Sequence, residues 1–299
     1  MNPKATNSVH DRDSKNTGLK SNTKVVGWVG HCATYILLIV AGVVTLVPVI
    51  WVIISSLRES SAVVAIPLGL PNPPQWSNYT YAWEAGKVRV SFRNSLIITS
   101  ASTFLVIGAS TLAGYSLARL KFFGRTSLFS VFILGLMIPF EAMMVPFYFR
   151  MWNFGLLNNP LSVILSFTAF TIPAGTLIMR AFYAEIPQEI EDAARVDGCS
   201  EFQLFLWIML PIAKPGVVSL AIVATVWSWN DFTRPLLLLQ NPDARTLPLA
   251  IINFQGAYGL IDVAPLFAAA VISFLPILLA YFILQKQFLQ GIMSGAIKG

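Results

Sequence analysis

Six long apolar stretches constrain this 299-residue chain more than any other feature. Each has roughly twenty residues, which is enough for a helix to cross the hydrocarbon layer of a bilayer. Only 11% of the residues are charged and 56% are hydrophobic, so the chain cannot build a soluble exterior. The sequence therefore predicts an all-α membrane protein with six transmembrane helices. The predicted spans lie near residues 31–55, 95–118, 127–148, 161–179, 216–238 and 264–284.

An even number of spans places the two termini on the same side of the membrane. Residues 1–24 are polar and basic, which predicts a disordered tail over 1–28, and basic segments favour the cytoplasmic side. We therefore expect both termini in the cytoplasm, with a six-span transmembrane domain over 29–285 and a cytoplasmic C-terminal tail over 286–299. The loop of about 181–215, between spans four and five, is then cytoplasmic. No small-residue cleavage site follows the first span, so we expect that span to be retained.

Several chemistries are excluded because the residues that they need are rare. The cysteines are Cys32 and Cys199 and the histidines are His10 and His31, which supports neither a disulfide framework nor a metal site, and no catalytic constellation occurs. The chain lacks G-x-x-x-x-G-K-[ST], so it is not expected to bind the phosphates of ATP. Its net charge of +6 (20 basic minus 14 acidic residues) is interpreted as charge that flanks and orients spans in lipid, not as a nucleic-acid surface.

The third span carries a carboxylate between two prolines, since Glu141 lies between Pro139 and Pro146. Each proline removes a backbone donor, which predicts a broken helix. Broken helices and intramembrane carboxylates commonly face a water-filled path. The alternative is that Glu141 lies at a membrane interface and ends a helix.

Asn230 and Asp231 lie near the predicted outer end of span five. Arg234 follows Asp231 by three residues, so the two can form an i,i+3 ion pair that neutralises itself. Here too, the alternative is an interface position that ends the helix.

The cytoplasmic loop predicts two short helices around a glycine turn. Pro187 suits a first helical turn, and the acidic residues that follow favour the positive end of the helix dipole. Gly198 is expected to end this first helix, of about Gln188 to Asp197, in the left-handed conformation.

The second loop helix is expected to begin at Ser200, because Gln203 three residues later completes a capping-box pattern. Leu210-Pro211 and Pro215-Gly216 are expected to break it before span five. From these residues alone, the pair of helices could also lie passively on the membrane surface.

This loop resembles that of the permease subunits of binding-protein-dependent ABC importers, which carry E-A-A, three residues, G and then I-x-L-P. Asp192-Ala193-Ala194, Gly198 and Ile208-Met209-Leu210-Pro211 match in order and spacing, with Asp in place of the first Glu. Further stretches are similar to the maltose-type carbohydrate branch, and residues 1–24 lie outside the resemblance. These stretches include Tyr115-Ser116-Leu117-Ala118-Arg119, Gly155-Leu156-Leu157-Asn158, Trp229-Asn230-Asp231-Phe232, Thr246-Leu247-Pro248-Leu249 and Gly291-Ile292-Met293-Ser294-Gly295.

The resemblance implies a permease in a prokaryotic plasma membrane that imports a carbohydrate and forms half of the translocation path. The implied partners are a homologous second permease subunit, two ATP-binding cassette subunits that hold ATP and Mg, and an external substrate-binding protein. This chain itself is expected to bind no cofactor and to catalyse no reaction. The residues expected to couple to the ATPase are Glu191, Asp192, Ala193, Ala194, Gly198, Leu210 and Pro211.

The candidate residues of the translocation path are Glu141, Trp229, Asn230, Asp231 and Phe232. The two aromatic residues offer stacking surfaces for a sugar ring, although aromatic residues in spans more often pack or face lipid. Two other classes stay open: an ABC permease for a peptide, amino acid or phosphate, and a secondary transporter. A membrane enzyme or structural protein is disfavoured by the missing catalytic constellation.

Overall fold

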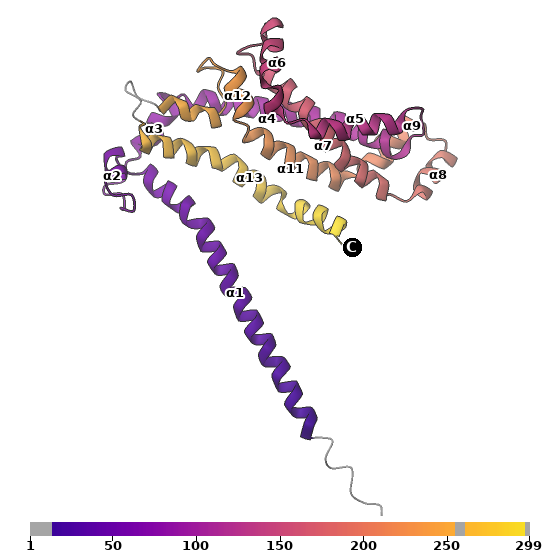
Figure 1. Ribbon diagram of the computed structural model, residues 1–299, viewed down its shortest axis with the longest axis horizontal. Helices are drawn as coiled ribbons and strands as arrows, with labels where there is room; N and C mark the ends of the chain where they lie inside the picture. Colours follow the sequence, from indigo (N-terminus) through magenta and orange to yellow (C-terminus); the bar gives the residue numbers. More distant parts are fainter. Residues whose placement is uncertain (1–13, 255–260, 297–299) are drawn as a thin grey trace, which may run out of the picture. The chain divides into compact units, whose positions relative to one another are not determined.

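The computed structural model describes residues 14–254 and 261–296, and every regular element in these ranges is helical (Figure 1). The chain divides into two compact units, residues 1–54 and 55–299. The first unit consists mainly of the long helix α1, Ser14–Ser56. α1 therefore extends into the stretch 1–28 that was expected to be a disordered tail, and no proline between positions 4 and 47 stops it. Residues 1–13 lie outside the described residues.

Four long helices form the framework of the second unit. These are α4 (Val88–Arg119), α7 (Pro160–Glu185), α11 (Lys214–Trp229) and α13 (Val263–Ala296). The shorter elements are α2 (Ser60–Ala65), α3 (Ser77–Glu84), α5 (Arg125–Met137), α6 (Phe140–Asn153), α8 (Gln188–Val196), α9 (Glu201–Gln203), η1 (Leu204–Met209), α10 (Leu210–Ile212), α12 (Thr233–Leu238) and η2 (Pro248–Phe254). α8 and α9 lie at one end of this bundle and α3 at the other (Figure 1). α13 continues beyond residue 285, where a C-terminal tail was expected.

α4 and α7 form the most extensive helix pair of the bundle. Small residues allow this close approach: a Cβ atom added at Gly114 of α4 would lie 2.7 Å from the Cβ of Met179 in α7. A Cβ atom at Gly175 of α7 would likewise meet Ser110 of α4. The two helix backbones are thus held together tightly from the middle of the bundle to the end that carries α8.

The chain is an all-α membrane protein with four to six candidate spans. Thr34–Ser56, Val88–Arg119, Pro160–Glu185 and Val263–Phe282 are each long and apolar enough to cross a bilayer. Two further candidates are bent pairs of helices: Arg125–Met137 with Phe140–Asn153 at 96°, and Glu201–Ile212 with Lys214–Trp229 at 73°. From Tyr35 to Ile50 the apolar side chains of the first candidate span, Thr34–Ser56, are exposed, as expected of a helix that lipid or another chain covers.

The expected helix break within the third predicted span, 127–148, is confirmed. α5 ends at Met137 and α6 begins at Phe140, with Pro139 in extended conformation between them. Proline disfavours the helical conformation of the residue before it, which explains the break at Ile138.

The prediction that residues 216–238 form one continuous helix is wrong. α11 ends at Trp229, and residues 230–232 separate it from α12. The amide of Asn230 donates to the carbonyl of Val226, and the carboxylate of Asp231 accepts from the backbone N–H of Arg234. Side chains that bond to the backbone in this way end one helix and start the next.

Candidate functional site

α8 is a short, charged helix that joins α7 through only Ile186 and Pro187. Acidic residues occupy its first turn and Arg195 its last, and both placements favour the helix dipole. Gly198 has a φ of +85°, which confirms the expected left-handed end, and a Cβ atom added there would meet nothing within 4 Å. Glycine is therefore favoured at this position by backbone conformation and not by lack of space.

The second loop helix begins with the expected capping box. The hydroxyl of Ser200 accepts from the N–H of Gln203 at 3.3 Å, and the Gln203 side chain accepts from the N–H of Ser200 at 2.9 Å. The expected break at Leu210-Pro211 is wrong, because the helix continues to Ile212. A π-helical segment over Leu204–Met209 precedes the proline, and this local change in hydrogen bonding accommodates the missing N–H of Pro211.

The helix is instead interrupted at Ala213. Lys214 begins α11, and Pro215 lies in its first turn, where the missing N–H of proline has no cost. A break before span five is therefore present as expected, at Ala213 between the two proline pairs, with a bend of 73°.

The predicted coupling residues lie on two different faces of the loop. Glu191 and Ala194 are buried, and Ala194 belongs to a core cluster with Leu204 and Phe205. The other residues lie outside this core: Asp192, Ala193, Gly198 and Pro211 are exposed, and Leu210 is half-buried. The loop thus has an inner face that packs against the bundle and an outer face of small and acidic residues.

A network of charges, which we call the Arg119 junction, joins the loop to the bundle. It comprises Arg119 of α4, Glu191 and Arg195 of α8, and Glu201 of α9. The Arg119 Nε atom lies 3.0 Å from the Glu191 carboxylate, and these side chains are only 12% and 4% exposed. Arg195 contacts the carboxylates of Glu191 at 3.3 Å and Glu201 at 2.9 Å. The hydrogen bond that Arg195 donates to the Glu201 carboxylate is the main cause that raises the pKa of Arg195.

Arg119 was missed as a functional residue by sequence reasoning, which named it only within the stretch Tyr115–Arg119 that is similar to the carbohydrate branch. It lies 72 positions before Glu191, so no local spacing pairs the two residues. Its position at the end of a span that faces an acidic loop is the one signal in the sequence that could have suggested the contact.

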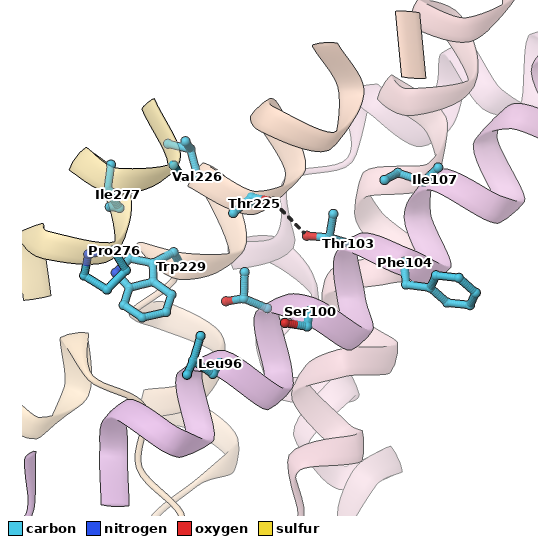
Figure 2. Close-up of a pocket in the computed structure, with 12 residues that line it drawn as sticks. Leu96, Ser100, Thr103, Phe104, Ile107, Thr225, Val226, Trp229, Pro276 and Ile277 are labelled. Carbon is cyan, nitrogen blue, oxygen red and sulfur yellow. Dashed lines mark hydrogen bonds between the residues drawn. The ribbon is translucent and has the colours of Figure 1, made fainter. Parts of the chain in front are cut away.

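Trp229 is buried at the end of α11. It is 4% exposed, its indole N–H donates to the carbonyl of Ser273 at 3.2 Å, and its ring packs edge-on against Phe92. It also lines a cavity of about 450 Å³ between α4, α11 and α13, which Figure 2 shows with Ser100, Thr103 and Thr225 on its wall. Thr103 and Thr225 are hydrogen-bonded to each other at 3.4 Å. Trp229 is thus already committed to packing inside this chain.

Asp231 and Arg234 form the expected i,i+3 ion pair, with 3.0 Å between their charged atoms. The Arg234 guanidinium lies 4.4, 5.5 and 5.7 Å from the ring centres of Phe140, Phe167 and Phe170. We call these five residues the Arg234 cage. It joins the start of α6, the middle of α7 and the break between α11 and α12.

The other path candidates lie outside the cage. Asn230, Phe232 and Glu141 are exposed, and Glu141 occupies the first turn of α6. Among the described residues Glu141 has no ion-pair partner within 4 Å, and no cluster of potential metal ligands occurs in the same part of the chain.

This architecture, a bundle of membrane-length and broken helices with a charged two-helix loop at one end, has the fold of an ABC-importer permease. It superposes on a chain of a bacterial ABC transporter involved in the import of the acidic polysaccharide alginate, with a TM-score of 0.72 over 94% of this chain and 100% of that one, at 20% identity. It also superposes on a chain of the bacterial alginate ABC transporter in complex with a periplasmic protein that binds an alginate pentasaccharide, with a TM-score of 0.64, 15% identity and coverage of 87% and 95%.

Residues 110–294 match the family model of binding-protein-dependent transport system inner membrane components, and the chain belongs to this family. It is 31% identical to a diacetylchitobiose uptake system permease protein (NgcG) of Streptomyces coelicolor, over 89% of this chain and 88% of that protein. It is 33% identical to an arabinooligosaccharides transport system permease protein (AraQ) of Halalkalibacterium halodurans, with coverage of 84% and 91%. It is 30% identical to a trehalose/maltose transport system permease protein (MalG) of Thermococcus litoralis, with coverage of 87% and 94%.

The chain is therefore a multi-pass inner-membrane permease component of the carbohydrate-uptake branch of this family. It is a non-catalytic subunit, and no cofactor is expected on it. It acts within an ABC transporter that receives its substrate from a binding protein.

Proposed function

We propose that this chain forms half of a membrane path for a sugar, oligosaccharide, polyol or glycerol phosphate and receives the energy of ATP hydrolysis through α8. Its relatives are named for the uptake of diacetylchitobiose, arabinooligosaccharides and trehalose/maltose, which supports the substrate class. The proposed coupling to ATP hydrolysis rests on the outer face of α8, which combines small residues with acidic charge beside a left-handed glycine.

The outer face of α8 is the proposed contact with the ATPase. Ala193 and Gly198 allow another backbone to approach closely, and Asp192, with a side chain 61% exposed, favours a basic partner surface. Leu210 and Pro211 continue this surface on the second loop helix. Glu191 and Ala194 act from the inner face and hold α8 against the bundle.

The proposed complex contains a homologous second permease, two ATP-binding cassette subunits and an external substrate-binding protein. The alginate transporter bound to a periplasmic protein is a solved complex of this kind. We further propose that α8 and both termini lie in the cytoplasm, which agrees with the basic residues near the N-terminus. The domain limits at 29–285, with flanking tails, belong to the same proposal.

For the translocation path we propose contact through the exposed candidates Glu141, Asn230 and Phe232. Trp229 and Asp231 support this surface from behind, since the side chains of both are committed to partners within the chain. One chain supplies one wall, and the second permease supplies the other.

The first experiment is purification of the tagged chain from its native membrane in mild detergent, followed by identification of the proteins that accompany it. We expect a second permease and an ATPase with a P-loop. The complex, placed in vesicles with its binding protein, should then take up a sugar only when ATP is present. A chain that purifies alone and transports without ATP would favour a secondary transporter, and uptake of an amino acid or phosphate would favour the other ABC class.

A pair of charge reversals locates the ATPase contact. Asp192→Arg should abolish copurification of the ATPase, because it places a like charge against a basic surface. Asp243→Arg is the matched control: this carboxylate is also exposed, but its partner is Lys87, which precedes the start of α4, so it lies at the opposite end of that helix from Arg119. Equal loss in both variants would contradict the proposed contact.

A further inference from the structure

The Arg119 junction forms the wall of a polar cavity of about 420 Å³ at the end of α4. Three of its four basic groups are already used: Arg119 is paired with Glu191, Arg125 donates to the carbonyls of Leu117 and Ala118, and Arg195 is paired with carboxylates, while Lys121 is the fourth basic side chain on the wall. The cavity is therefore better explained as a charged joint between elements than as a site for an anion.

Arg119 contacts three different residues from a single side chain. Its guanidinium donates to the carbonyl of Tyr183 at 2.9 Å, near the end of α7, and to the carbonyl of Ile186 in the link to α8. It also forms the buried ion pair with Glu191 in the first turn of α8. One residue at the end of α4 thus holds the end of α7, the link and α8.

The covalent connection alone does not fix α8. Only two residues join it to α7, and Gly198 and its neighbours separate it from the next helix. Apart from the packing of Ala194 and the half-buried Ile190, its inner face is attached through charged atoms. An ion pair with this little exposure resists opening, because either charge left alone in the interior is costly.

We propose that Arg119 is a positioning residue that makes α8 move as one body with α4 and α7. When the ATPase displaces α8, the tightly packed α4–α7 pair then moves with it, because α8 does not shift relative to these helices. The proposal rests on the proposed function for its transport consequence, but the attachment of α8 is a property of this chain by itself.

The first test measures the attachment directly. Hydrogen exchange of the α8 amides is followed in the full chain in lipid nanodiscs, for wild type, Arg119→Gln and Glu191→Gln. We expect both variants to exchange about tenfold faster across residues 188–196, while the exchange of α4 and α7 stays unchanged. Unchanged exchange in α8 would overturn the proposal, whether or not the chain transports a sugar.

Arg125→Gln is the matched control. Arg125 also caps carbonyls at the end of α4 and lines the same cavity, but its hydrogen bonds go to Leu117 and Ala118 of α4 and not to α8. It should leave α8 exchange at the wild-type rate. An equal increase in the α8 exchange rate of this variant would show that the cavity as a whole has loosened, and it would overturn the specific role of Arg119.

The second test measures sugar transported per ATP hydrolysed in the reconstituted complex. We expect Arg119→Gln to retain the ATPase in the complex and to lower this ratio about tenfold, and the exchanged pair Arg119→Glu with Glu191→Arg to recover part of it. A wild-type ratio in Arg119→Gln would overturn the proposal. If the wild-type complex itself shows no ATP-dependent transport, the proposed function fails, and the exchange measurement still decides the attachment of α8.

Discussion

The Arg119 junction and the Arg234 cage each hold a mostly enclosed arginine against a carboxylate, but they are built in opposite ways. In the cage the charge partner is three residues away on the same segment, and aromatic rings from other helices surround the pair. In the junction the charge partner is on another element, and further donors reach backbone carbonyls of a third. The cage therefore neutralises its charge locally and joins helices through apolar contact, whereas the junction joins helices through the charges themselves.

This difference predicts how each cluster responds when its charge is removed. In the cage the charges can be removed while Asn at position 231 keeps the bond that Asp231 accepts from the backbone N–H of Arg234. In the junction the charges cannot be removed without loss of the donor to the backbone carbonyls. The variants below test that contrast from the largest expected effect to the smallest.

Asp231→Asn should be the most destabilising change, because it leaves the Arg234 charge inside the phenylalanine rings without its partner. Removing one member of a buried pair costs about 3–5 kcal/mol of unfolding free energy. The measurement is reversible unfolding in detergent micelles. Adding Arg234→Met should recover most of the loss, since an apolar chain of similar length suits the three rings. A double variant no more stable than the single one would show that the cage is not self-contained.

The corresponding double variant in the junction, Arg119→Met with Glu191→Leu, should stay less stable than wild type. The carbonyls of Tyr183 and Ile186 lose their donor, and each buried acceptor left unsatisfied costs about 1–3 kcal/mol. The same unfolding assay compares it with the double variant of the cage. Complete recovery here would remove the distinction between the two clusters.

Gly198→Val should impair coupling more than folding. A branched side chain resists positive φ at a cost of about 1–2 kcal/mol, and the neighbouring space is open, so the strain is confined to the backbone turn after α8. We expect uptake to fall while ATP hydrolysis continues, measured as sugar transported per ATP. Gly198→Asn is the control, because asparagine tolerates this conformation. Full uptake in the valine variant would refute a role for the turn in coupling.

Ser200→Ala should have the smallest effect, about 1 kcal/mol, through loss of the cap that holds the first turn around Glu201. The expected sign is faster hydrogen exchange over residues 201–212, with Ser200→Asp close to wild type because aspartate also caps. If the alanine variant exchanges no faster, then the Arg195–Glu201 pair alone holds the far side of the junction.

Much of the loop could be predicted from the sequence because its signals are local. A proline, a run of acids and a glycine define α8 to within one residue, and the capping box of Ser200 and Gln203 needs only a spacing of three. The Asp231–Arg234 pair was predictable for the same reason. Its aromatic surroundings were not, since Phe140, Phe167 and Phe170 come from other parts of the chain.

The wrong predictions share a physical cause. Leu210-Pro211 was expected to break its helix, and 216–238 was expected to be one span, because composition was weighed without the hydrogen bonds that the backbone finds. A π-helical segment carries the chain through Pro211, and side chains of Asn230 and Asp231 bond to the backbone inside an otherwise apolar run. The Arg119 contact was missed because it depends on two helices meeting, which no spacing in the sequence encodes.

The π-helical segment also determines where the chain can tolerate the deletion of one residue. Leu204 and Met209 are both fully buried although they are five positions apart, a separation that would turn them about 140° from each other in an α-helix. The extra residue is absorbed within the segment, so the helix beyond it keeps its rotational phase. Loss of one residue here can therefore convert the segment to regular α-helix and leave Pro211 and α11 facing as before. The same deletion within α7 would rotate everything after it by about 100°.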